Sequence, residues 1–157
     1  MRFFVAALVI LITVQAFAQT SSPHSTGHTD PIYLKFQEIK WHRIMPELGE
    51  NSPEIVILHV APNTNATKLM IRVPKNFHVS KHWHTANETH TVVSGTFIME
   101  HIDGQRHELG AGSFNYVPAK AVHQGWTKPD EGALLFITVD GAWDVNWVDE
   151  PPKPSSK

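Results

Sequence analysis

Short apolar stretches separated by turn residues fill most of the chain beyond its first 31 positions. The stretches are rich in Val, Ile, Thr and aromatic residues, as β-strands are, and they cover 54–60, 67–73, 89–93, 96–102, 113–117, 122–127, 133–139 and 143–148. Turn-forming pairs such as Ser94-Gly95 and Asp103-Gly104 separate them at hairpin-like spacing. No sustained helical periodicity follows residue 18. The pattern therefore predicts an all-β fold, a small antiparallel β-barrel or jelly roll.

The first 18 residues have the pattern of a secretory signal peptide. Arg2 supplies a positive start, 3–14 is a short apolar run, and Ala16-Phe17-Ala18 has the small-x-small form of a cleavage site. The alternative is an uncleaved anchor, but a spanning helix needs about 20 apolar residues. We therefore expect cleavage, a mature chain that begins near Gln19, a periplasmic or secreted location, and no stable membrane insertion afterwards.

Both ends of the remaining chain have a composition that favours disorder. Residues 19–31 consist largely of Ser, Thr, Pro, Gly and His, which cannot bury enough apolar surface to fold, so we expect a flexible linker. Residues 151–157 are proline-rich and are expected to form a disordered tail. Residues 32–150 then have the length of one barrel domain.

Charge and cysteine content limit the partners and the chemistry. The 157 residues include 13 basic and 15 acidic side chains without a basic cluster, so neither nucleic acid nor an anionic membrane surface is indicated as a partner. A small-molecule substrate or ligand is the expected partner. The chain has no cysteine, so the fold must be held by packing without disulfides, and a metal ion must bind to His, Asp or Glu.

The segment from His82 to Glu88 combines two imidazoles and a carboxylate at a suggestive spacing. If it is extended, His82, His84 and Glu88 lie on one face of a strand and converge. Neutral imidazole and carboxylate together are typical ligands of a divalent transition metal. A further ligand must come from elsewhere in the fold, and His123, which follows Pro118, is the best candidate.

These residues carry a resemblance to the cupin family. The first cupin motif runs Gly, five residues, His-x-His, three or four residues, Glu, six residues, Gly. His82, His84, Glu88 and Gly95 fit every spacing, and Asn76 stands where the motif has its first glycine.

The second cupin motif also fits. It runs Gly, five residues, Pro-x-Gly, two residues, His, three residues, Asn. Gly112, Pro118 and His123 match it, whereas Lys120 replaces a glycine and Thr127 replaces the asparagine. These departures fall in turns and not at ligand positions. The resemblance covers roughly residues 54–140.

The resemblance implies one divalent transition metal, Fe, Mn, Zn or Ni, held by His82, His84, Glu88 and His123. Such a site leaves positions open for an oxygen ligand or for substrate plus dioxygen. The expected function is a metal-dependent enzyme that acts on a small oxygenated compound, either dioxygenase-like or an isomerase or decarboxylase. The alternative is a non-catalytic module that binds a small ligand or sugar and has a metal site. Other small cupins form dimers, so the resemblance also raises a homodimer as an alternative to a monomer.

Two further histidines are candidates for roles beside the metal. His90 lies two residues beyond Glu88 on the same strand face, so it should point into the barrel as a hydrogen-bond donor or a general acid or base. The alternative is a histidine that is simply hydrogen-bonded in the core lining. His78 is expected in a loop at the barrel mouth, either as a substrate contact or as a solvated residue.

Overall fold

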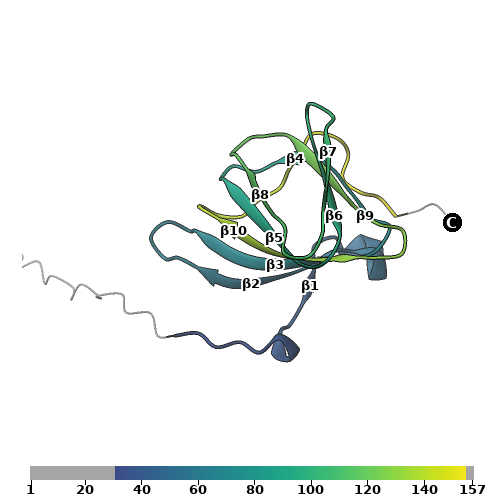
Figure 1. The fold of residues 1–157 in the computed structure, drawn as a ribbon. Helices are drawn as coiled ribbons and strands as arrows, with labels where there is room; N and C mark the ends of the chain where they lie inside the picture. The colour runs from purple at the N-terminus through teal and green to yellow at the C-terminus, as the bar shows by residue number, and fades with distance from the viewer. Residues whose placement is uncertain (1–30, 155–157) are drawn as a thin grey trace, which may run out of the picture. The chain divides into compact units, whose positions relative to one another are not determined.

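Eleven short strands in two antiparallel sheets make up the fold in the computed structural model, which describes residues 31–154 (Figure 1). Residues 34–154 belong to one compact unit. The expected signal peptide and the linker up to residue 30 lie outside the described residues, as do the last three residues of the expected tail. Within 31–154, no helix has the length and apolar character needed to cross a membrane.

The chain passes back and forth between the two sheets (Figure 1). The six-stranded sheet has the order β1-β2-β3-β10-β5-β8, from β1 (His42–Arg43), β2 (Glu54–Val60), β3 (Thr67–Val73), β5 (Glu88–Gly95), β8 (Phe114–Val117) and β10 (Ala133–Val139). The five-stranded sheet has the order β11-β4-β9-β6-β7, from β4 (His78–Trp83), β6 (Phe97–His101), β7 (Arg106–Leu109), β9 (His123–Thr127) and β11 (Asn146–Trp147). Two short 3-10 helices, η1 (Phe36–Glu38) and η2 (Pro46–Asn51), precede β2. This arrangement confirms the expected jelly roll.

The agreement between predicted and observed strands depends on how apolar each strand is. The stretches 54–60, 67–73 and 133–139 coincide with β2, β3 and β10. By contrast, β4 and β7 fall outside every predicted stretch, because their sequences HVSKHW and RHEL are mainly polar or charged. Only two residues of the stretch 143–148 form a strand, β11.

The core lies between the inner faces of the two sheets. Alternate residues of β3 and β10 are buried, and the sheets contribute buried side chains that include Leu69, Met99, Leu135 and Ile137. Fully burying one such side chain stabilises the fold by about 1.5–3 kcal/mol. The apolar core therefore provides a rigid frame for the polar residues that the same interior contains.

Candidate metal centre

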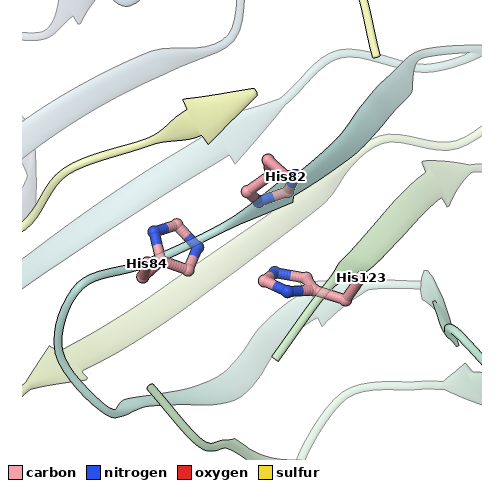
Figure 2. Close-up of side chains that lie close together, drawn as sticks. All are labelled: His82, His84 and His123. Atoms are coloured by element: carbon pink, nitrogen blue, oxygen red, sulfur yellow. The ribbon is translucent and has the colours of Figure 1, made fainter. Parts of the chain in front are cut away.

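Three histidine side chains meet inside the barrel (Figure 2). His82 lies on β4, His84 follows the end of that strand, and His123 begins β9. All three residues are buried, and their ligand nitrogens lie within 4.8 Å of one another. In the pairing of β4 with β9, His82 is directly opposite His123. In the part of the chain that the structure describes, this is the one group of His, Asp and Glu side chains that could hold a metal ion.

The Nδ1 atom of each ring faces a main-chain carbonyl oxygen. The carbonyls are those of Ser80 (2.7 Å from His82), Ala121 (3.0 Å from His123) and Asp144 (next to His84). Because a carbonyl oxygen only accepts, Nδ1 carries a proton and donates it. The Nε2 lone pair of each neutral ring is thereby left free, as it is in histidines that ligate a metal.

Burial keeps two of these rings uncharged at neutral pH. Burial, reinforced by the neighbouring His84, lowers the pKa of His82 to about 4. Burial and the neighbouring His82 lower the pKa of His123 to about 3. A metal ion binds the neutral form of the ring. These two rings are already neutral at neutral pH, so neither has to release a proton before it binds an ion.

Glu88 lies beside the three histidines at the start of β5. Its side chain is 1% exposed, and its Oε1 accepts a hydrogen bond from Trp143 Nε1 at 3.2 Å. Its Oε2 lies 2.9 Å from His84 Nε2 and 3.1 Å from His90 Nε2, yet neither approach is aligned as a hydrogen bond, which leaves Oε2 without a hydrogen-bond partner among the described residues.

The charge of this carboxylate is retained in the interior. Burial would raise the pKa of Glu88, but the rings of His90 and His84 outweigh burial and hold that pKa below its usual range. Burial likewise opposes a charge on His84, but the Glu88 carboxylate outweighs it and raises the pKa of His84. Glu88 is therefore a buried anion that needs a cation next to it.

The donor set fits a divalent transition metal. Imidazole nitrogens and a carboxylate oxygen suit Fe, Mn, Ni or Zn. His84 Nε2 and Glu88 Oε2 are 2.9 Å apart, about the separation of two atoms that bind one ion at right angles with bonds of roughly 2.1 Å. Both atoms are acceptors when the ring is neutral, so a proton or a metal ion is needed to hold them together. Glu88 nevertheless stands outside the group of ligand atoms that all lie within 4.8 Å of one another.

The predicted residues come together by a different geometry from the one expected. We expected His82, His84 and Glu88 on one face of a single strand. Instead β4 ends at Trp83, the chain turns, and Glu88 begins β5 in the other sheet. The residues therefore approach one another across a corner between the two sheets.

His90 and His78 have different surroundings. His90 is buried on β5 beside Glu88, and its Nδ1 has no hydrogen-bond partner among the described residues. The expectation that His78 lies in a loop is wrong: it begins β4, its Nε2 lies 3.0 Å from Gln124 Oε1, and its ring stacks on Trp126. The strand at His78 was not predicted because β4 has too few apolar residues for the sequence pattern to indicate a strand.

Comparison with known proteins settles the family. Residues 69–146 match the family model described as the cupin domain, and several solved cupins share the fold. The chain belongs to the cupin superfamily.

Solved structures with low sequence identity agree with this cupin in fold. The polyketide cyclase RemF from Streptomyces resistomycificus matches with a TM-score of 0.65 and 18% identity, over 79% of this chain and 89% of that one. KdgF from Halomonas sp. matches with a TM-score of 0.57 and 15% identity, over 69% and 94%. A structure from a study of the DMSP lyases RdDddP and RnDddQII matches with a TM-score of 0.56 and 20% identity, over 74% and 63%. No curated protein matches the chain.

A small cavity of the cupin barrel adjoins the histidines. It has a volume of about 70 Å³, which exceeds the roughly 10–15 Å³ that a cavity needs to hold one water molecule. Its polar side is formed by His82, His84, Glu88, His90 and His123, and its walls include Phe77, Phe97, Met99, Leu135, Trp143 and Trp147. The cavity therefore offers one polar corner in an otherwise apolar space, which suits a small ligand held at one end.

The sequence analysis missed the residues that the C-terminal part of the cupin brings to the site. Trp143 donates to Glu88, and the Asp144 carbonyl accepts from His84. The Asp144 carboxylate accepts a hydrogen bond from Thr85 N at 2.9 Å. Trp143 was identified only as the first residue of the predicted strand 143–148. No local pattern connects it with Glu88, 55 residues earlier in the chain.

Proposed function

We propose that this cupin is a mononuclear metal-dependent enzyme that acts on a small oxygenated organic compound. The observation that carries the proposal is His90, a buried side chain capable of proton transfer that lines the same cavity as the three histidines. A divalent ion such as Fe, Mn, Zn or Ni, when bound, would supply Lewis acidity and open positions for an oxygen ligand. A titratable group next to such positions is what proton-transfer chemistry needs.

In this proposal, the chain's own residues bind, orient and move protons. His82, His84 and His123 hold the ion, and Glu88 adds a carboxylate beside them. His90 Nε2 lies 3.1 Å from Glu88 Oε2, and the unpartnered Nδ1 of His90 is available to a substrate oxygen. The apolar walls exclude water and strengthen each electrostatic contact.

The size and chemistry of the cavity support a small substrate with a hydroxyl or carbonyl oxygen. A cavity of about 70 Å³ excludes bulky ligands in this conformation. Reactions compatible with the site are a dioxygenase-like cleavage, an isomerisation and a decarboxylation. Two of the similar structures come from proteins named as a cyclase and as lyases, which supports an enzymatic use of the fold without transferring either reaction.

The test combines metal content with turnover. Wild type, His84→Ala, His123→Ala and His90→Gln are purified, their metal is measured by elemental analysis, and loaded protein is screened against small hydroxy and oxo acids and catechols. We expect one ion per chain in wild type and His90→Gln, loss of the ion in both alanine variants, and turnover by wild type but by none of these three variants. His107→Ala, on the exposed edge strand β7, is the control.

Three results would contradict the proposal. Unchanged metal content in both alanine variants would show that His84 and His123 do not bind the ion. Full turnover by His90→Gln would show that His90 is not needed for proton transfer. A loaded wild type that binds a compound from the screen without converting any would favour the binding module over an enzyme.

We also propose that the protein is exported, on the basis of the signal-peptide pattern in residues 1–18. The intact mass of the protein recovered from a secreting host should correspond to a chain that begins near Gln19. Recovery of the full-length chain from the cytoplasm alone would contradict export.

A further inference from the structure

A segment near the C-terminus crosses the site and contacts three of the candidate ligands. This C-terminal strap consists of residues 141–148. Trp143 donates to Glu88, the Asp144 carbonyl accepts from His84, and the Trp147 ring centroid lies 5.4 Å from that of His82. The strap therefore connects parts of the site that come from both sheets.

Hydrogen bonds to the loop and strand beneath it fix the position of the strap. Asp144 accepts from Thr85 N at 2.9 Å through its carboxylate, and Asn146 Nδ2 donates to Asp144 Oδ2 at 3.0 Å. At the far end, Val148 N donates to Lys81 O at 2.8 Å. Trp143 directly precedes Asp144, so its backbone is held beside the loop that carries Thr85.

The two oxygens of Glu88 have different partners. Oε1 accepts the indole N–H of Trp143 at 3.2 Å, which is the one aligned hydrogen bond that this carboxylate receives from the described residues. Oε2 has none and lies 2.9 Å from His84 Nε2. An indole N–H is only a donor, so it engages one lone pair of Oε1 and cannot itself ligate a metal. The oxygen with no donor, and therefore the one more available to a cation, is Oε2.

We infer that Trp143 is a positioning residue, whose indole N–H holds Oε1 of Glu88 so that Oε2 is presented to the three histidines. The inference rests on the proposed metal site and adds a residue to it. Without this hydrogen bond, the carboxylate is free to turn about its last side-chain torsion and to present either oxygen. Residues that orient a ligand in this way typically change metal affinity by about 10- to 100-fold when they are mutated.

The test uses Trp143→Phe, which keeps an aromatic wall and removes the N–H. The matched control is Trp126→Phe, the same change at an indole that stacks on His78 away from the cavity and leaves the hydrogen bond to Glu88 intact. Both variants and wild type are loaded with Co²⁺, affinity is measured by competition with a chelator, and the visible absorption bands of the bound ion are recorded.

We expect Trp143→Phe to bind one Co²⁺ about 10- to 100-fold more weakly than wild type and with shifted bands. Trp126→Phe should keep the wild-type spectrum and an affinity within a few fold. A Trp143→Phe protein with wild-type affinity and spectrum would overturn the inference while leaving the metal site in place. A wild type that binds no Co²⁺ would overturn the proposed site and the inference with it.

A second measurement does not depend on whether the variant folds. In ¹⁵N-labelled wild type, loading with Zn²⁺ should shift the indole N–H resonance of Trp143 and slow its exchange with water. The indole of Trp126, which stacks on His78 away from the cavity, should be unaffected. An unchanged Trp143 resonance in protein shown to contain Zn²⁺ would overturn the inference.

Discussion

At the scale of single residues, β4 turns one histidine to solvent and another to the candidate metal site. His78 and His82 are four residues apart, so regular strand alternation would place them on the same face. A register shift between Val79 and His82 in the pairing with β9 interrupts that alternation. His78 is consequently exposed, whereas Val79 and His82 both line the cavity. The bulge decides which histidine can be a ligand.

The two residues that stand where the cupin motifs have glycine adopt a positive φ, a conformation that glycine takes up readily. Asn76 has a φ of 54° and Lys120 a φ of 64°, both in the left-handed region. Asn adopts this region more readily than most residues, whereas Lys does so at a cost of about 1–2 kcal/mol. Lys120 N donates to His84 O at 2.8 Å, so the strained turn is held against the chain that carries a candidate ligand.

The motif glycine at position 95 cannot be replaced in the same way. It has a φ of +75°, and an added Cβ would lie 2.0 Å from Gly132 O. We expect Gly95→Ala to lower the free energy of unfolding by roughly 2–4 kcal/mol, because strain and backbone overlap act together. Gly110→Ala is the matched control, since its Cβ would meet no atom within 4 Å. Urea unfolding measures both, and equal midpoints would contradict the expectation.

At the scale of elements, the sequence predicted best the strands that carry the core. Strict burial alternation in β3 and β10 produces a strong period-two pattern, and the predicted bounds of both are the observed ones. β4 carries His82 but is mainly polar, so its existence could be inferred only from the ligand spacing. The polar side chains of the candidate metal site take the place of the apolar residues that would make this strand recognisable.

The candidate site likewise combines contacts that could be predicted from the sequence with contacts that could not. His82, His84 and His123 come together as the spacing and the family resemblance led us to expect. The corner between β4 and β5 could not be predicted, because extended and bent forms of the segment both bring the ligands close. The contact between Trp143 and Glu88 was also beyond reach, since it depends on where the strap crosses the barrel.

At the scale of the whole molecule, the candidate ligands belong to both sheets. His82 and His123 lie on strands of the five-stranded sheet, and Glu88 lies on a strand of the six-stranded sheet. An ion bound by all of them would tie the sheets together in a chain that has no cysteine for a disulfide. Without an ion, burial of Glu88 Oε2 without a hydrogen bond is a cost to the folded state.

Metal removal should therefore lower the stability of the whole domain. An ion that binds the folded state alone, present at about 100 times its Kd, stabilises that state by about 2.7 kcal/mol, which for a domain of this size corresponds to a rise in Tm of roughly 10 °C. Calorimetry of loaded and chelator-treated protein measures the difference. It should vanish in His123→Ala, which lacks a ligand, and persist in His107→Ala, whose side chain is exposed on β7. Comparing the metal-induced shift within each variant cancels the effect of the substitution on the barrel itself. An undiminished shift in His123→Ala would mean that the ion stabilises the fold from some other site.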